Sequence, residues 1–295
     1  MSGNTDLLYC ITLDDPSGEF EPASELLNAL ELDFSSFFDR ENCTVKHTVY
    51  SLSEAEAVKN KQKLAQAFQE WQEFGVELTM GEIFPLKKEE WAEAWKKYFQ
   101  PVQISEKLVV RPSWLTDPPL PGQKVLQIDP GMSFGTGQHA TTYFCLKQID
   151  RFAGEKTSLL DAGCGSGILA IAGALLGYEK IDAFDFDPDA VEVARENIQL
   201  NNVQDKISPQ VGNAADWQGD PEKYDLVCAN ILGHLLIAFR FNIVSWLRPG
   251  GHLVLAGILD KDFDKVSSAY TELGLSECCR FTDRSWTGGV FVNQA

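Results

Sequence analysis

Three glycines and two acids form the clearest chemical pattern in this sequence. Asp161 is followed by Gly163, Gly165 and Gly167, and Asp185 lies at the end of a second apolar run. Glycines between a strand and a helix let a ligand approach the backbone closely. An acid at the end of the next strand can accept hydrogen bonds from two ribose hydroxyls. The pattern predicts a site for a cofactor that contains a nucleoside.

The spacing of the glycines bears on which cofactor this is. A dinucleotide needs a free helix N-terminus for its pyrophosphate, and its fingerprint is the longer G-x-G-x-x-G. S-adenosylmethionine has no phosphate, yet its carboxylate and ribose also need close backbone approach. Asp185 could serve either cofactor. The shorter G-x-G-x-G, together with Asp161 and the turn Arg248-Pro-Gly-Gly251, favours S-adenosylmethionine.

A segment upstream of the glycines combines glycine, aromatic and hydroxyl residues. It runs from Pro130 to Thr142 and precedes an apolar helix. Thr141 and Thr142 could simply cap that helix, but the density of Gly, Phe, His and Thr exceeds what a cap needs. This favours a ligand wall or lid, in which we expect His139 to have a structural role.

The candidate catalytic residue is Asn230, at the end of a strand downstream of the glycines. Its side-chain oxygen could accept the N–H of an incoming amine. Methyltransferases that act on amides or exocyclic amines often carry two prolines and an aromatic residue after this asparagine, whereas Ile231 and Leu232 follow here. A flexible alkylamine is therefore the expected acceptor, and no dedicated base is evident.

The elements that must position these residues alternate between strands and helices from residue 105 onward. The carboxyl ends of strands one, two and four in such a sheet open onto one crevice. The last two strands could form an antiparallel hairpin at the sheet edge. We expect an α/β, Rossmann-like seven-stranded sheet, with strands at 159–162, 180–186, 207–211, 224–229, 252–258, 275–281 and 286–292, and helices at 168–176, 188–201, 235–247 and 263–273.

The N-terminal part has the pattern of a smaller α+β domain. Its expected order, β-α-β-β-α-β, matches a split-βαβ, ferredoxin-like arrangement. Ser53-Glu-Ala-Glu56 is a capping box that opens a long helix ending at Gly75. The segment contains no catalytic constellation, which predicts a recognition module at residues 1–87. The expected buried stripe of the long helix is Val58, Leu64, Ala65, Phe68 and Trp71.

An aromatic helix is expected between the two domains, as a linker at residues 88–104. Its residues Trp91, Ala94, Trp95, Tyr98 and Phe99 share one helical face,. This spacing is more typical of a helix that packs between domains than of a ligand platform. The cofactor-binding domain then spans residues 105–295.

Composition restricts the classes of partner and compartment. The chain has 43 acidic and 25 basic residues, a net charge of −18, which repels a phosphate backbone and attracts a basic partner. We therefore expect no direct nucleic-acid binding. No apolar run approaches about 18 residues and no signal peptide is evident, so we expect a cytoplasmic protein with no membrane contact. The seven cysteines form no C-x-x-C pair, and we expect no metal site.

The sequence resembles the bacterial methyltransferases of ribosomal protein L11, the PrmA family. The resemblance covers residues 90–260 closely and the N-terminal domain only by pattern. The matching segments are Trp91-x-x-x-Trp95, Tyr98-Phe99, Pro112-Ser-Trp114, Gly131-x-x-Phe134-Gly-Thr-Gly-x-His139-x-Thr-Thr142, Asp161 to Ala172, Asp185-x-Asp-Pro188 and Asn230-Ile-Leu232.

The resemblance implies a function and a set of site residues. It implies cofactor contact by Thr142, Gly163, Asp185 and Asn230, and an N-terminal domain that grips a basic ribosomal protein of the large subunit. The implied activity is transfer of methyl groups from S-adenosylmethionine to lysine side chains and the N-terminal amine. The alternatives are an N-methyltransferase acting on another protein, RNA or a small-molecule amine, and a nicotinamide- or adenosine-binding module without transfer activity.

Overall fold

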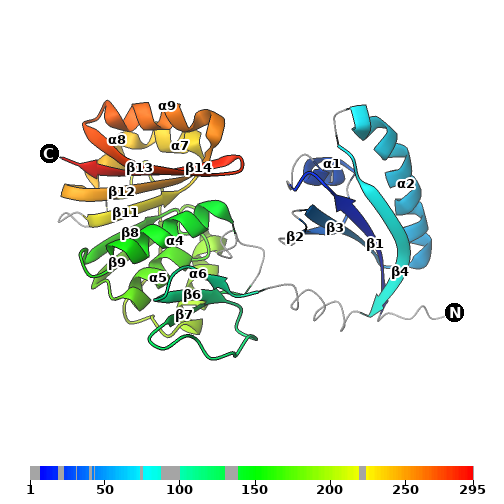
Figure 1. Ribbon diagram of the computed structural model, residues 1–295, viewed down its shortest axis with the longest axis horizontal. Helices are drawn as coiled ribbons and strands as arrows, with labels where there is room; N and C mark the ends of the chain where they lie inside the picture. Colours follow the sequence, from blue (N-terminus) through cyan, green and yellow to red (C-terminus); the bar gives the residue numbers. More distant parts are fainter. Residues whose placement is uncertain are drawn as a thin grey trace. The chain divides into compact units, whose positions relative to one another are not determined.

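The computed structural model divides the chain into two units, Met1–Tyr98 and Phe99–Ala295. It describes residues 7–18, 23–30, 32–39, 42, 44–73, 76–87, 100–129, 139–218 and 224–294. Among these residues, no helix is long and apolar enough to cross a membrane. The two units are shown in Figure 1 and are described separately.

The N-terminal unit is an antiparallel four-stranded sheet with two helices. Its elements are β1 (Leu7–Asp15), α1 (Ala23–Ala29), β2 (Phe34–Asp39), β3 (Thr44–Ser51), α2 (Glu54–Glu73) and β4 (Thr79–Lys87), the element order expected from the sequence. The sheet order is β2-β3-β1-β4. Ile11, Leu13, Val49, Leu64 and Trp71 are buried together in one core between the strands and the helices.

Ser53 caps α2 as expected, but the Glu56 carboxylate accepts from the residue before the cap rather than from Ser53 itself,. Glu56 N–H donates to Ser53 Oγ (3.2 Å), and Leu52 N–H donates to the Glu56 carboxylate (2.8 Å). The expected buried stripe of this helix is wrong at two positions. Val58 is 44% exposed and Ala65 is exposed, whereas Ala57 and Ala67 are buried. The helix therefore faces the sheet through Ala57, Leu64, Ala67 and Trp71, an i, i+3, i+4 stripe with a different phase.

The C-terminal unit is built on a seven-stranded sheet with the order β10-β9-β8-β11-β12-β14-β13. Neighbours from β10 to β12 are parallel, and β14 pairs antiparallel with both β12 and β13. The expected seven-stranded α/β sheet with a closing hairpin is confirmed. The strands are β8 (Ser158–Ala162), β9 (Lys180–Asp185), β10 (Gln210–Val211), β11 (Tyr224–Asn230), β12 (Leu247–Leu259), β13 (Leu275–Asp283) and β14 (Trp286–Asn293).

Helices cover both faces of this sheet, as Figure 1 shows. The first core contains buried residues of α4 (Ala140–Phe152), α5 (Ile168–Leu176) and α6 (Pro188–Leu200). The second contains residues of α7 (Gly233–Ala238), α8 (Arg240–Ser245) and α9 (Asp260–Thr271). All five residues of β8 are buried because this central strand has helices on both sides.

The chain order places a switch point between β8 and β11. From β8 the chain moves outward through β9 to β10, and it returns to the other side of β8 as β11. In open α/β sheets, ligands bind at the carboxyl ends of the strands where the order reverses in this way. Gly163 directly follows β8 and Asn230 ends β11, so the fold itself brings the glycine turn next to the candidate catalytic residue.

Two expectations about this unit need correction, and one sheet in it was not expected. Residues 100–104 of the expected linker helix are not helical: β5 (Val102–Gln103) pairs with β6 (Leu108–Arg111), and Pro101 is unsuited to a helix interior. β6 pairs in turn with β7 (Lys124–Gln127) in a three-stranded sheet that the proline-rich sequence concealed. The expected helix 235–247 is two short helices that meet at Phe239. Residues 88–99 lie outside the described residues.

Candidate functional site

The turn after β8 is held in place by backbone hydrogen bonds. The N–H groups of Gly163 and Cys164 both donate to the carbonyl of Phe184, at 2.9 Å. Gly163, Gly165 and Gly167 all have positive φ angles, a conformation that glycine adopts readily. A Cβ on Gly163 would lie 2.5 Å from Cγ2 of Ile231. The missing side chain therefore lets the β11 end pack directly against the glycine turn.

Asp185 ties the end of β9 to the same turn. Its Oδ2 accepts the N–H of Gly165 (2.8 Å), and its Oδ1 accepts the N–H of Asp187 (3.1 Å). Each carboxylate oxygen has further acceptor capacity beyond these single bonds. The side chain of Asp185, the predicted ribose acceptor, is 7% exposed. The two hydrogen bonds fix its orientation, and its remaining acceptor positions can receive ligand hydroxyls.

Asp161 is buried behind the turn. One carboxylate oxygen accepts the N–H of Ala170 (3.0 Å), which anchors α5 to β8. The other, Oδ1, is buried without a hydrogen-bond partner among the described residues. Burial raises the pKa of this carboxyl to about 7, with the Ala170 N–H opposing the shift and Asp185 adding to it. Asp161 therefore has a structural place behind the turn and does not line the cavity in front of it.

A small cavity of about 30 Å³ lies between the glycine turn, α4 and the end of β11. Thr142 from α4 and Asn230 from β11 face each other across it, with Asn230 Nδ2 donating to Thr142 Oγ1 at 3.5 Å. The side-chain oxygen of Asn230 is buried and has no hydrogen-bond partner among the described residues. The described residues that line it are Thr142, Gly163, Cys164, Gly165, Ser166, Ile168, Leu169 and Asn230.

An unpaired buried acceptor is unfavourable by about 1–3 kcal/mol. Such an atom at the wall of a cavity is well suited to receive a donor from a ligand. Of the four predicted cofactor-binding residues, Thr142, Gly163 and Asn230 line the cavity directly. The fourth, Asp185, is not among the lining residues, but it accepts a hydrogen bond from the N–H of Gly165, which is. The structure thus brings together residues that are far apart in the sequence.

The N-cap of α4 is His139, so Thr141 and Thr142 do not have the capping role that was considered as an alternative to a ligand wall. His139 Nδ1 accepts the N–H of Thr141 (3.4 Å) and lies 2.8 Å from Thr141 Oγ1. Its ring packs edge-on against Trp286, with centroids 5.0 Å apart. Burial lowers the pKa of His139, although Asp283 opposes the shift, so the ring is neutral at pH 7. This supports the structural role expected for His139.

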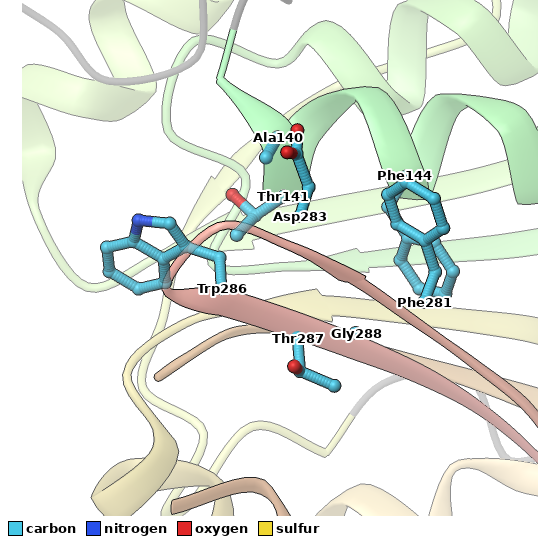
Figure 2. Close-up of a pocket in the computed structure, with 8 residues that line it drawn as sticks. All are labelled: Ala140, Thr141, Phe144, Phe281, Asp283, Trp286, Thr287 and Gly288. Carbon is cyan, nitrogen blue, oxygen red and sulfur yellow. The ribbon is translucent and has the colours of Figure 1, made fainter. Parts of the chain in front are cut away.

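The hairpin of β13 and β14 holds the start of α4, a contact that sequence reasoning missed. Figure 2 shows the shallow pocket between these two elements. Phe281 of β13 stacks on Phe144 of α4, with centroids 6.1 Å apart and planes at 3°, and a Cβ on Gly288 would overlap the Phe144 ring. The available signal was the apolar spacing of α4, which indicates a buried face but not its partner. Residues 130–138, the rest of the predicted ligand wall, lie outside the described residues.

Comparison with known proteins is consistent across sequence and structure. The family model for ribosomal protein L11 methyltransferase (PrmA) matches residues 23–293. The chain is 38% identical over 205 residues to the ribosomal protein L11 methyltransferase of Alkaliphilus oremlandii, which covers 69% of this chain and 65% of that protein. It is 40% identical over 200 residues to the protein of the same name from Bacillus subtilis, which covers 68% and 63%.

The chain thus spans just under two thirds of the length of the curated relatives it matches. A crystal structure described as ribosomal protein L11 methylase from Lactobacillus delbrueckii subsp. bulgaricus gives a TM-score of 0.61 at 29% identity. The superposition covers 66% of this chain and all of that one. On the extent of the family match, the chain belongs to the ribosomal protein L11 methyltransferase (PrmA) family.

Proposed function

We propose that this chain is an S-adenosylmethionine-dependent protein N-methyltransferase whose acceptor is a lysine side chain or N-terminal amine of a basic ribosomal protein of the large subunit. The observation that carries the proposal is Asn230, which lines the switch-point cavity and whose side-chain oxygen is buried and has no hydrogen-bond partner among the described residues. This acceptor suits the N–H of an amine. Family membership supports the same reaction class.

The residues around the cavity fit S-adenosylmethionine. Gly163, Gly165 and Gly167 all have positive φ angles, and the first two line the cavity with no side chain of their own to occupy it. Asp185 retains acceptor capacity for two ribose hydroxyls. The Asn230 oxygen, which has no hydrogen-bond partner among the described residues, can accept an N–H from the amine that receives the methyl group or from the ammonium group of the cofactor. When bound, the cofactor supplies a methyl group on a sulfonium, activated for transfer to a nucleophile.

The role of Asn230 is to orient the nitrogen that accepts the methyl group. Its oxygen would accept one N–H of the neutral amine and direct the nitrogen lone pair at the methyl carbon. Thr142 fixes the amide from the opposite side. Positioning raises the rate when the amine nitrogen and the methyl carbon are held about 3–3.5 Å apart and in line for the transfer.

The amine must lose a proton before it can react. A free lysine has a pKa of about 10.4, so the neutral form costs roughly 4.6 kcal/mol at pH 7. A neighbouring sulfonium and partial desolvation both lower that pKa. His139 uses its Nδ1 at the start of α4, and no histidine is among the described residues that line the cavity. The proton is therefore expected to leave to solvent without a dedicated base.

Charge supports a basic protein as the substrate. The first 98 residues contain 19 acidic and nine basic residues, and the remaining 197 contain 24 and 16. The N-terminal unit therefore has the higher density of negative charge, as suits a module that grips a basic ribosomal protein. The two relatives named above are called methyltransferases of ribosomal protein L11, and we propose the same protein as the substrate here. Absence of direct nucleic-acid binding and a cytoplasmic location stay predictions.

Radiolabelled methyl transfer tests the proposal directly. Purified protein is incubated with labelled S-adenosylmethionine and, separately, ribosomal protein L11, total ribosomal protein and ribosomal RNA, and the modified residues are mapped. Label in lysine or the N-terminal amine of L11 is expected. Label in RNA or in another protein would identify that molecule as the acceptor in place of L11. Binding of a nicotinamide cofactor, with no binding of S-adenosylmethionine, would overturn the proposal.

Substitution at the site tests the role of Asn230. Asn230→Ala should lower turnover by about 100-fold, the scale seen when a single aligned hydrogen bond that orients a reacting group is lost. Asn242→Ala is the matched control, since Asn242 is half-buried, donates to the carbonyl of Ala215 and is not among the residues that line the cavity. Unchanged turnover in Asn230→Ala would remove Asn230 from the mechanism.

A further inference from the structure

The edge strand β13 contains a bulge at two adjacent cysteines. Glu277 pairs with Phe291 and Cys279 pairs with Val290, so the register between β13 and β14 shifts at Cys278. A bulge places two residues of one strand opposite a single residue of its partner. The usual alternation of side chains between the two faces of a strand is therefore interrupted between residues 277 and 279.

Contacts on each side of the bulge show which face each residue occupies. Before it, the Glu277 carboxylate accepts from Ser267 Oγ of α9 at 2.6 Å, so Glu277 faces α9. After it, Phe281 stacks on Phe144 of α4, so Phe281 faces α4. Side chains along a strand alternate between its two faces. Cys279, two residues before Phe281, is therefore on the α4 face. Cys278, one residue after Glu277, is on the face opposite to Glu277, which is also the α4 face.

The side chain of Arg151 supports this placement. Its Nη1 on α4 lies 3.9 Å from the Cys279 sulfur, and its charge also acts on Cys278. The register and the Arg151 contact together place both thiols on the α4 side of the sheet,. Figure 1 shows α4 and α9 on opposite sides of this sheet. In a regular strand, two consecutive cysteines would point to opposite faces.

Exposure distinguishes this pair from the other described cysteines. Cys278 is exposed and Cys279 half-buried, whereas Cys10, Cys145, Cys164 and Cys228 are buried. Burial and the neighbouring Cys279 thiol raise the pKa of Cys278, with Arg151 opposing the shift. Because both thiols lie on one face of the sheet, the pair can bind a single soft centre through two sulfur atoms.

We propose that Cys278 and Cys279 form a two-thiol site for soft thiophilic ligands, of which a monosubstituted trivalent arsenical is the representative. Both thiols condense with one arsenic centre in its hydrated form, RAs(OH)2: two As–O bonds break, two As–S bonds form, and the two thiol protons leave with the two hydroxyl groups as two water molecules. Phenylarsine oxide takes up one water to give this form, so its net reaction releases one water. No oxidant or reductant is needed. The site is independent of the proposed methyl transfer.

Binding of phenylarsine oxide to the full chain tests the site. Cys43 lies outside the described residues, so every protein carries Cys43→Ser. The parent should bind one phenylarsenic group, detected by intact mass spectrometry, that resists excess monothiol and is released by a 1,2-dithiol. Cys278→Ser and Cys279→Ser should each weaken binding by about 100-fold, because the second thiol acts at high effective concentration only when both are present.

A rearranged pair tests the bulge itself. Cys278→Ser with Arg280→Cys keeps two adjacent cysteines, but Arg280 faces α9, where its guanidinium pairs with Asp264. The thiols then lie on opposite faces, and binding should fall to the level of the single-serine variants. Equal affinity in this variant, or monothiol-resistant binding in either single-serine variant, would overturn the proposal. Peptide mapping that finds the arsenic on other cysteines would also overturn it.

Discussion

Replacing Gly163 with alanine tests whether the turn after β8 requires a residue without a side chain. Gly163 has a φ of +75°, which costs an alanine about 1–2 kcal/mol. The new Cβ would also lie 2.5 Å from Cγ2 of Ile231, and overpacking of this kind costs about 1–3 kcal/mol. The two effects together predict a loss of about 2–5 kcal/mol in the free energy of unfolding.

A second glycine separates the two effects. Gly250 has a nearly identical φ of +72°, and no atom lies within 4 Å of the position its Cβ would take. Gly250→Ala should therefore cost only the conformational part, about 1–2 kcal/mol. The difference between the two variants isolates the contact with Ile231. Urea denaturation of the full chain, followed by tryptophan fluorescence, measures both.

The contact can then be relieved from its other side. Ile231→Ala removes Cγ2, so the double variant Gly163→Ala/Ile231→Ala should lose less stability than the sum of the two single variants, by about 0.5–3 kcal/mol. Calorimetric binding of S-adenosylmethionine should follow the same order, since Ile231 adjoins Asn230. The reasoning is refuted if Gly163→Ala is no less stable than Gly250→Ala, or if the two changes at 163 and 231 are additive.

Three further substitutions test other parts of the fold. Phe281→Ala removes the ring stacked on Phe144 and should weaken S-adenosylmethionine binding several-fold by calorimetry, while stability falls only slightly because Phe281 is 46% exposed. Because burial raises the pKa of Asp161 to about 7, the folded state keeps a proton that the unfolded chain releases near pH 4. Stability should therefore fall as pH rises from about 4 to about 7, and Asp161→Asn should flatten that slope in urea titrations. Ser53→Ala removes the acceptor for Glu56 N–H and should destabilise the N-terminal unit by about 0.5–2 kcal/mol in the same assay.

Local patterns with a strong physical cause could be predicted from the sequence. The run at 158–162 is buried on both faces, so it is apolar without alternation and is recognisable as a central strand,. The N-cap at Ser53 and the glycine turn at Gly163 depend on neighbouring residues alone. The seven-stranded sheet followed from counting such strands and from the hairpin at the end of the chain.

Features that depend on distant partners could not be predicted in this way. Val58 is apolar and at helical spacing, but the phase of α2 on its sheet is set by Ala57 and Ala67, whose small side chains carry little hydrophobic signal. The β6 strand at Leu108–Arg111 is short and precedes a proline-rich stretch, so its pairing with β5 and β7 defines it. His139 caps α4 because Trp286 holds its ring, and these residues are far apart in the sequence.

Gly257 shows how far the site extends beyond its motif. It belongs to no pattern noted in the sequence, yet it has a φ of +79°, and a Cβ there would lie 2.6 Å from the carbonyl oxygen of Ile231. Ile231 is thus enclosed between Gly163 on one side and Gly257 on the other. Because the contact at Gly257 is with backbone rather than a side chain, it cannot be relieved by a change of rotamer.

Alanine at position 257 must therefore displace the backbone that carries Asn230. We expect Gly257→Ala to weaken S-adenosylmethionine binding at least as much as Gly163→Ala does, and Ile231→Ala to restore little of it, because the clash is with the carbonyl that alanine also has. Unchanged affinity in Gly257→Ala, measured by calorimetry on folded protein, would mean that residue 231 can move without its neighbour. Asn230 would then be positioned by Thr142 rather than by the packing of the strand end.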